Sequence, residues 1–251
     1  MAEPLLRIRG LAKHYGGLKA LDGIDLDVDR GAMHALIGPN GAGKTTLVHG
    51  ISGAMACDAG TIELGDCRIE GWPMHRRVGA GLVRSHQVAS LFTHLSALDN
   101  VALAVQARAG SSFRFWAPAA GDRHMFDAAG HALAQVGLSN RAGTLAAALS
   151  HGEQRRLELA MVLATGARLL LLDEPMAGMG PEESGAMVAL IAGLRPARTI
   201  LLVEHDMDAV FRLADRISVL VDGRVLATGT PDAIRANAEV RRAYLGEDLP
   251  A

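Results

Sequence analysis

Cysteine, aromatic residues and an excess of charge of either sign are all scarce in this sequence of 251 residues. The two cysteines, Cys57 and Cys67, are too few for a disulfide framework and are typical of a reducing compartment. Aromatic residues make up 4 % of a chain that is 49 % hydrophobic, so we expect a mainly aliphatic core. With 25 basic and 27 acidic residues and no basic tract, nothing indicates a nucleic-acid partner.

Long apolar runs and a secretory leader are also missing. The N-terminus has no basic segment followed by an apolar stretch, so no signal peptide is expected. Charge interrupts the longest apolar runs, as where Asp173 and Glu174 follow Leu169–Leu172, so no membrane span is predicted. Any role at a membrane is therefore expected to depend on a partner.

The sequence does contain a complete phosphate-binding loop. Residues 38–45 read Gly-Pro-Asn-Gly-Ala-Gly-Lys-Thr, which matches G-x-x-x-x-G-K-[ST]. A strand-like run, Met33–Ile37, precedes the loop and a helix-like run, Thr45–Ser52, follows it. Lys44 would reach the outer phosphates and Thr45 would bind Mg²⁺. The alternative is a glycine-rich turn without a ligand, but the full match in this context favours a nucleoside-triphosphate site.

A second element is the apolar run Leu169–Leu172, which ends in Asp173 and Glu174. In α/β folds, ligands bind at the carboxyl ends of parallel strands. We expect Asp173 to bind Mg²⁺ and Glu174 to orient an attacking water, because these tasks need separate carboxylates. Taken alone, the pattern favours an ordinary strand followed by a polar loop, and the phosphate loop reverses this in favour of the catalytic interpretation.

The rest of the chain divides into strand-rich ends around a helical middle. Residues 98–163 have a helical, alanine-rich pattern with a break at 109–118. A hairpin is expected at Gly65-Asp66 and another at Asp222-Gly223. Strands are predicted at Leu5–Arg9, Ala20–Val28, Thr61–Leu64, Cys67–Ile69, Leu169–Leu172, Thr199–Val203 and Ile217–Val221.

A third element, Leu149-Ser150-His151-Gly152-Glu153, resembles the LSGGQ signature of ABC-transporter ATPases. Other positions match that family in the same order along the chain. Tyr15 resembles the aromatic residue that stacks on adenine, Gln87 the glutamine loop, and His205 the switch histidine. The resemblance extends from Leu5 to about Asp248 and rests on six elements in the correct order.

This resemblance implies an α/β fold of the P-loop NTPase type. It would have a RecA-like core, an antiparallel β-subdomain and an inserted helical subdomain. Residues 1–251 would form a single nucleotide-binding domain, with the helical subdomain at approximately 88–163. The implied activity is ATP hydrolysis coupled to transport, with ATP and Mg²⁺ as cofactors.

The resemblance also assigns site residues. Glu174, His205 and Gln87 would be catalytic, and Thr45, Gln87 and Asp173 would bind Mg²⁺. The residues expected around the ATP phosphates are Gly38, Pro39, Asn40, Gly41, Ala42, Gly43, Lys44, Thr45 and Thr46. The residues expected to cap the γ-phosphate in the opposite subunit are Ser150, His151, Gly152 and Glu153.

The implied partners follow from this arrangement. A second copy or a paralogous ATPase subunit would complete a head-to-tail dimer with two ATP molecules. Integral-membrane permease subunits would hold the chain at the cytoplasmic face of the plasma membrane, and a solute-binding protein would act indirectly. A permease helix is expected to dock on Val88–Asn100, through Val88, Leu91, Phe92 and Leu95. Alternatively, these apolar residues fill the core of the helical subdomain.

Several of these residues have simpler explanations when taken singly. A lone tyrosine usually packs, and a lone Gln87 is usually a solvated loop residue. The ten histidines show no metal-ligand spacing, so His205 could be an ordinary residue at a strand end. Arg155 and Arg156 are most simply explained as a solvated helix face. The cluster Phe113–Trp116 is a contact surface or ordinary packing.

The chain departs from the common family pattern at four positions. His151 replaces glycine in the signature and Glu153 replaces glutamine. Gly180 stands where many relatives have aspartate, and His86 stands where an aromatic residue is frequent. A carboxylate near a triphosphate is unfavourable unless it is paired or points away. These changes leave the expectation of ATP binding intact and make the hydrolysis rate harder to predict.

The segment Pro175–Glu183 is similar to the E-P-x-A-G-[LM] pattern of branched-chain amino-acid importers, and Val240–Glu247 is similar to their C-terminus. This indicates import of branched-chain or other hydrophobic amino acids, or of urea-like solutes. The alternatives are an ATPase of the lipopolysaccharide-export type and a soluble non-transport ABC ATPase. A P-loop kinase or GTPase is disfavoured by the signature and by the lack of an Asn-Lys-x-Asp motif.

Overall fold

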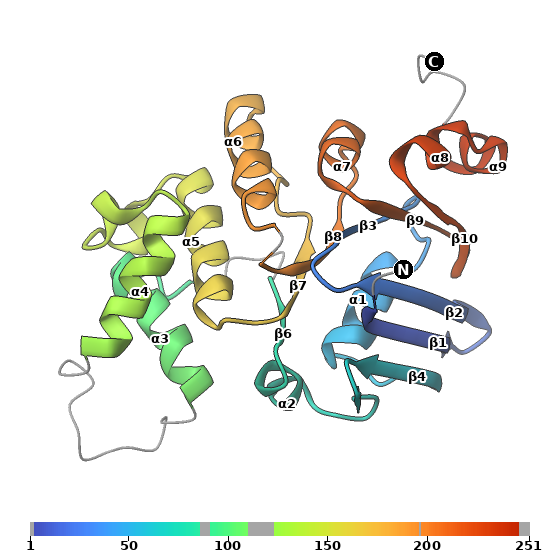
Figure 1. Cartoon of the computed structure of the whole chain (residues 1–251), viewed down its shortest axis with the longest axis horizontal. Coiled ribbons are helices and arrows are strands. Elements are labelled where there is room, and N and C mark those ends of the chain that lie inside the picture. Colours follow the sequence, from blue (N-terminus) through green and yellow to red (C-terminus); the bar gives the residue numbers. More distant parts are fainter. Residues whose placement is uncertain (1–2, 86–90, 110–122, 196, 246–251) are drawn as a thin grey trace.

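Two β-sheets and several helices make up the computed structural model, which describes residues 3–85, 91–109, 123–195 and 197–245 (Figure 1). The strands are β1 (Pro4–Tyr15), β2 (Leu18–Asp29), β3 (Met33–Ile37), β4 (Ala59–Leu64), β5 (Cys67–Arg68), β6 (Leu82–Arg84), β7 (Leu169–Asp173), β8 (Thr199–Val203), β9 (Arg216–Val221) and β10 (Arg224–Gly229). The helices are α1 (Lys44–Ser52), α2 (Met74–Gly79), α3 (Ala97–Ala109), α4 (Arg123–Gln135), α5 (His151–Ala164), α6 (Pro181–Ala192), α7 (Met207–Leu213), α8 (Pro231–Ala236) and α9 (Ala238–Val240).

The larger sheet has the strand order β10-β9-β3-β8-β7-β6. Strands β9, β3, β8, β7 and β6 are parallel, and β10 pairs with β9 in the antiparallel direction. All residues of β3, β7 and β8 are buried, as expected for continuous apolar strands covered on both faces. The register places Asp173 beside Val203 and Leu36 beside Val203, so these three strands end at one edge.

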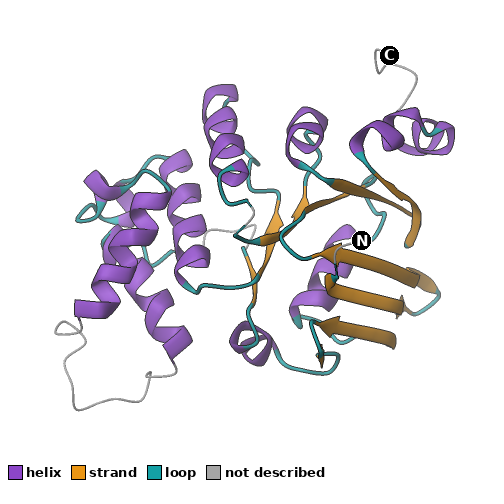
Figure 2. Ribbon diagram, in the orientation of Figure 1, coloured by secondary structure: helices purple, strands orange, loops and turns teal. Residues whose placement is uncertain are grey.

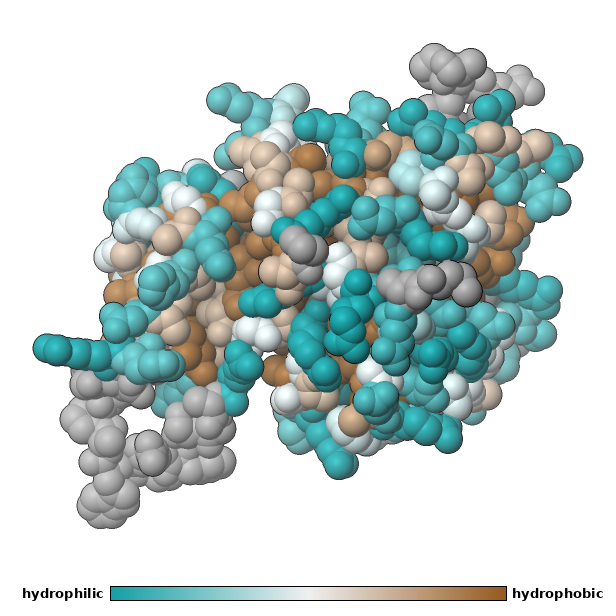
Figure 3. All heavy atoms as spheres, in the orientation of Figure 1, coloured by the Kyte–Doolittle hydropathy of each residue, from teal (hydrophilic) through white to brown (hydrophobic). Residues whose placement is uncertain are grey.

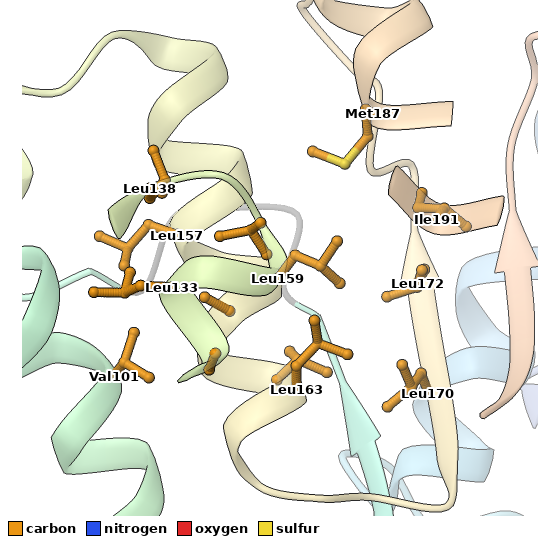
Figure 4. Packing of buried hydrophobic residues seen from close by; sticks show 14 of the residues in the cluster. Val101, Leu133, Leu138, Leu157, Leu159, Leu163, Leu170, Leu172, Met187 and Ile191 are labelled. Carbon is orange, nitrogen blue, oxygen red and sulfur yellow. The ribbon is translucent and has the colours of Figure 1, made fainter. Parts of the chain in front are cut away.

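Alternate residues of β7 point to opposite faces of the large sheet and pack in two different hydrophobic clusters. Leu170 and Leu172 pack with Met187 and Ile191 of α6, as Figure 4 shows. Leu169 and other residues of opposite parity pack with α1 and the antiparallel sheet. Helices α6 and α7 therefore lie on one side of the large sheet, and α1 with the smaller sheet lies on the other (Figure 2). The predicted α/β core is confirmed.

The smaller sheet is antiparallel, as predicted, and its strand order is β2-β1-β4-β5. Strands β1 and β2 are each 12 residues long and extend beyond the predicted Leu5–Arg9 and Ala20–Val28. The pairing of β1 with β2 has several register shifts. The charged and glycine residues along these strands interrupt the alternating pattern, so the sequence did not reveal their full length. Strand β5 ends at Arg68, one residue earlier than predicted, and the three-residue β6 was not predicted because so short a run has no visible period.

Helices α3, α4 and α5 pack on one another at one end of the molecule (Figure 1). Val101, Leu133 and Leu157 meet between them, while Leu159 and Leu163 on α5 face β7 (Figure 4). The predicted break at 109–118 begins at Ala109, where α3 ends, and its other residues lie outside the described part. On the face drawn in Figure 3, hydrophobic residues gather around the join between these helices and the large sheet. No helix among the described residues is long and apolar enough to cross a membrane.

Candidate functional site

The phosphate loop connects β3 to α1 and depends on glycine at two positions for its shape. A Cβ atom at Gly38 would lie 2.0 Å from the Leu220 carbonyl oxygen, and one at Gly43 would lie 2.5 Å from that of Ala20. Gly43 is the N-cap of α1 with φ 101°, a left-handed conformation that favours glycine. The loop is therefore held tightly against the strands on both sides.

The start of α1 is suited to an anion. No side chain caps this helix and its first turn has no acidic residue, so its amide groups remain available to a ligand. Lys44 Nζ donates to the carbonyl oxygens of Gly38 and Pro39, the latter at 2.9 Å. Burial lowers the pKa of Lys44, while the Glu174 and Asp173 carboxylates act in the opposite direction. Thr45, also in the first turn of α1, is exposed.

Asp173, Glu174 and His205 lie together at the same sheet edge. The Asp173 side chain is 4 % exposed, and its Oδ2 accepts a bond of 2.8 Å from Arg84 Nη2. Glu174 has a φ of 48°, a left-handed conformation unusual for this residue type and typical of functional sites. His205 Nδ1 is 3.9 Å from Glu174 Oε1, which brings together two of the three residues predicted to be catalytic.

The third predicted catalytic residue, Gln87, lies outside the described residues, as does His86. Tyr15 is at the end of β1 and is largely exposed, so its ring is accessible to a ligand. Its hydroxyl bonds Met55 Sδ at 2.8 Å, and Lys13 Nζ lies 5.5 Å from the centre of the ring. Stacking on adenine stays a prediction for this residue.

The signature begins α5 with a complete capping box. Ser150 Oγ accepts from the Glu153 amide at 3.2 Å, and Glu153 Oε2 accepts from the Ser150 amide at 2.9 Å. Glu153 Oε1 also pairs with Arg141 Nε at 2.9 Å. The bond from Ser150, followed by Arg141, lowers the pKa of Glu153. The unusual glutamate is thus paired within its own helix start.

The other signature residues face the segment that follows Glu174. His151 is exposed, and its ring lies 3.3 Å from the position of a Cβ atom at Gly178. A Cβ atom at Gly152 would lie 2.4 Å from Glu183 Oε1, so a larger residue there would displace the Glu183 side chain. Helices α5 and α1 are well separated in Figure 1, so the signature does not reach the phosphate loop of its own chain.

Sequence reasoning missed Glu204, which is 1 % exposed. Its carboxylate accepts from the Met176 amide at 3.0 Å and from the His205 amide at 3.2 Å, and Oε2 is 3.9 Å from His205 Nδ1. Burial raises the pKa of Glu204. This residue ties the turn after Glu174 to the segment of His205. Its position directly after the buried β8, like that of Glu174 after β7, was the available signal.

Two further contacts were not visible in the sequence. Arg84, which pairs with Asp173, is a single charge in the unpredicted β6. The Tyr244 hydroxyl interacts with the backbone of Gly38, and burial raises the pKa of this tyrosine.

One prediction was wrong: Arg155 is not on a solvated face, because its side chain is 13 % exposed and pairs with Glu158 at 3.0 Å. The cluster Phe113–Trp116 lies outside the described residues.

The donor set is compatible with Mg²⁺ bound together with a nucleotide. Among the described residues there is no group of three or more His, Cys, Asp or Glu side chains that could hold a metal ion alone. Mg²⁺ commonly binds one or two protein oxygens and takes its remaining ligands from phosphates and water. Thr45 and Asp173 have oxygens of this kind, so a metal held by them would be bound together with the phosphates.

Comparison with protein families gives two matches. Residues 21–177 match the model described as ABC transporter. Residues 224–249 match the model described as branched-chain amino acid ATP-binding cassette transporter. The first match includes the phosphate loop, the signature and Asp173-Glu174, and the second includes Tyr244.

Individual proteins resemble the chain over its full length. It is 40 % identical to the high-affinity branched-chain amino acid transport ATP-binding protein BraF of Pseudomonas aeruginosa, over 98 % of this chain and 100 % of BraF. It is 34 % identical to the lipopolysaccharide export system ATP-binding protein LptB of Escherichia coli, over 97 % of this chain and 98 % of LptB. Its fold matches the crystal structure of the ADP conformation of MJ1267, an ATP-binding cassette of an ABC transporter. That match has a TM-score of 0.86 and 26 % identity, over 98 % of this chain and 100 % of the other.

Proposed function

Because this chain belongs to the ABC transporter family, in its branched-chain amino acid branch, we propose that it hydrolyses ATP to power the import of branched-chain amino acids. The observation that carries the proposal is the meeting of four features at one sheet edge. These are the uncapped start of α1, the buried Asp173, the Glu174 carboxylate and His205. Other hydrophobic amino acids and urea-like solutes belong to the same substrate proposal.

Each residue of the site has a proposed role. The backbone N–H groups of the phosphate loop and of the first turn of α1 bind the phosphates together with the Lys44 side chain. To reach the phosphates, Lys44 gives up its bonds to the carbonyl oxygens of Gly38 and Pro39. Thr45, Asp173 and Gln87 hold Mg²⁺, which supplies charge neutralisation at the outer phosphates. Glu174 orients and polarises the attacking water, and His205 lies beside it to contact the γ-phosphate. Glu174 directly follows β7 and has a left-handed backbone conformation.

The signature is proposed to act on ATP bound by another subunit. Ser150 and Gly152 lie at the start of a helix whose N–H groups can donate to a γ-phosphate, but α5 is remote from α1 in the same chain. A head-to-tail pair of chains, whether two copies or paralogous subunits, would bring each signature to the other's phosphate loop. The pairing of Glu153 with Arg141 supports this, because it removes an unbalanced negative charge from the phosphate cap.

The permease and the membrane location are proposed together. A cavity of about 230 Å³ lies between β6, α3 and α5. Apolar residues such as Val83, Leu91 and Met161 line it, together with the charged Arg84, Arg108 and Glu158. Phe92 is 52 % exposed near this cavity, whereas Leu91 packs partly on the core and lines it. Permease subunits docked here would hold the chain at the cytoplasmic face of the plasma membrane, with a solute-binding protein on the other side. The whole of 1–251 would act as one nucleotide-binding domain, with a helical subdomain at approximately 88–163.

Reconstitution with the permease subunits in lipid vesicles tests this function. Uptake of radiolabelled leucine should require ATP, and Lys44→Ala should abolish it. Loss of one charged hydrogen bond should weaken ATP binding by about 1.5–3 kcal/mol. An ATPase of the lipopolysaccharide-export type would instead show no leucine uptake and would co-purify with a permease of lipid-export type. The C-terminal family match at 224–249 and the higher identity to BraF favour the importer.

A further inference from the structure

The ion pair between Arg84 and Asp173 joins the edge strand β6 to the strand that carries the proposed Mg²⁺ ligand. The distance from Arg84 Nη2 to Asp173 Oδ2 is 2.8 Å, and the side chains are only 8 % and 4 % exposed. Arg84 pairs in register with Leu171, and its side chain reaches forward to the carboxylate two residues further along β7. Ser85 supports the same corner, because its Oγ accepts from the Asp173 amide at 3.3 Å.

Because this ion pair is buried, neither charge can be compensated by water. An isolated carboxylate in such a position is strongly disfavoured, so Asp173 needs a cation beside it at all times. The Arg84 guanidinium is that cation in this structure. Arg84 Nε has no hydrogen-bond partner among the described residues, so the guanidinium has bonding capacity that Asp173 does not use.

We propose that Arg84 is the resident counter-ion of Asp173 and sets the affinity of this carboxylate for Mg²⁺. A positive charge within 2.8 Å of the ligand oxygen opposes a divalent cation that arrives alone. The metal that arrives with the phosphates has their negative charge to offset this repulsion. Arg84 thus acts as a positioning residue that couples metal binding to nucleotide binding. The inference rests on the proposed function, in that it takes Asp173 as a metal ligand.

A titration with Mn²⁺ in the absence of nucleotide tests this role, with free Mn²⁺ measured by electron paramagnetic resonance. Arg84→Gln should bind Mn²⁺ at least fivefold more tightly than the wild type, because the opposing charge is gone. Arg84→Lys, which keeps the charge, should stay close to the wild type. The matched control is Arg168→Gln, since Arg168 is an exposed arginine at the far end of β7 that bonds the Ala80 carbonyl oxygen.

Asp173→Asn separates failure of the inference from failure of the proposed function. If Asp173→Asn weakens Mn²⁺ binding in the presence of ADP while Arg84→Gln leaves the nucleotide-free affinity unchanged, Asp173 is a ligand and the counter-ion role is overturned. If Asp173→Asn leaves Mn²⁺ binding with ADP unchanged, the assignment of Asp173 itself is wrong. In the double variant Arg84→Gln/Asp173→Asn, the gain of Arg84→Gln should disappear.

Thermal unfolding provides the second measurement. Arg84→Gln should melt earlier than the wild type in EDTA, and millimolar Mg²⁺ should restore more of its melting temperature than it adds to the wild type. Should the variant not fold in EDTA, refolding in Mg²⁺ is expected to rescue it. A loss of stability that Mg²⁺ does not reduce, in either format, would show a purely structural pair.

Discussion

Asp173 and Glu174 are adjacent in the sequence, yet the fold gives their carboxylates different surroundings. Asp173 ends β7 in a buried position beside Arg84. Glu174 has already left the strand, with a left-handed backbone and a more exposed side chain near His205. This difference is what a division of labour between metal binding and water activation requires.

Glu174→Gln is expected to keep ATP bound while slowing its hydrolysis by at least 100-fold, on the scale of losing a general base. The amide has the shape of the carboxylate but cannot accept the proton of the attacking water. ATP binding by filter assay and phosphate release with the permease present would measure both effects. Glu182→Gln, at an exposed position in the first turn of α6, is the matched control. Equal hydrolysis rates for wild type and Glu174→Gln would exclude this role.

The buried His34 is expected to make the free energy of unfolding depend on pH. This residue of β3 is buried, its Nε2 bonds Ser218 Oγ at 2.8 Å, and burial lowers its pKa from 6.5 to about 4. Its contribution is complete above pH 6.5 and is lost as the pH falls from 6.5 towards 4, because only the unfolded chain takes up the proton there. The loss amounts to about 3 kcal/mol.

Urea unfolding at pH 7, 6 and 5 measures that dependence. The unfolding free energy of His34→Gln should fall less steeply than that of the wild type across this range. His131→Gln, on the exposed side of α4, controls for the type of substitution. Parallel pH profiles for wild type and His34→Gln would mean that other groups control the acid sensitivity.

At the scale of elements, the segment before α3 is held in shape by a buried side chain. Asn100 Oδ1 accepts from the Phe92 amide at 2.8 Å, and Nδ2 donates to the Phe92 and Ser96 carbonyl oxygens. The Phe92 side chain nevertheless remains exposed while Leu91 packs inward. Leu91 therefore fits the interpretation that this segment fills the core of the helical subdomain. Docking of a permease helix on Phe92 stays a prediction. Val88 and Ser90 lie outside the described residues.

Cysteine crosslinking tests whether this segment contacts the permease. In a background with Cys57 and Cys67 replaced by serine, Phe92→Cys and Leu95→Cys should crosslink to the permease in membranes. Leu18→Cys should not, although Leu18 is 66 % exposed, because it lies in the antiparallel sheet. Crosslinks near Ala227–Arg235 with none at Phe92 would move the contact to the C-terminal hairpin and leave the ATPase assignment intact.

At the scale of the whole molecule, the phosphate loop and the signature, which are the proposed two halves of an ATP site, lie far apart in one chain. The phosphate loop lies at α1, beside the antiparallel sheet, and the signature lies at the start of α5 among the helices (Figure 1). The proposed head-to-tail dimer would close both sites at once. Hydrolysis would then remove the nucleotide that joins the two chains.

ATP should therefore control the oligomeric state. Glu174→Gln with ATP should dimerise in light scattering, and the same variant without nucleotide should be monomeric. Adding Ser150→Arg should block dimerisation by placing bulk in the phosphate cap. Ser150→Ala separates this from the capping bond, whose loss should cost about 1 kcal/mol of stability. A dimer that forms without ATP and tolerates Ser150→Arg would refute the head-to-tail arrangement for the isolated chain.

The sequence by itself determined the parts of this protein whose chemistry is local. The phosphate loop, the strand that ends in Asp173-Glu174 and the helix start at Ser150 each consist of consecutive residues, so their type and spacing were sufficient. The parallel core and the antiparallel sheet followed from runs of apolar residues. The roles assigned to single residues such as Tyr15 and Gln87 stay predictions.

Only the tertiary structure decided which distant residues meet. Arg84 and Asp173 are 89 positions apart, and Met176 and Glu204 are 28 apart. A lone arginine in a three-residue strand has no period that reveals its partner, and charged residues such as Arg155 look solvated until the helix is packed. These contacts depend on the order and register of strands in the sheet, which many sequences of similar pattern would leave open. The surroundings of each carboxylate are therefore a property of the fold.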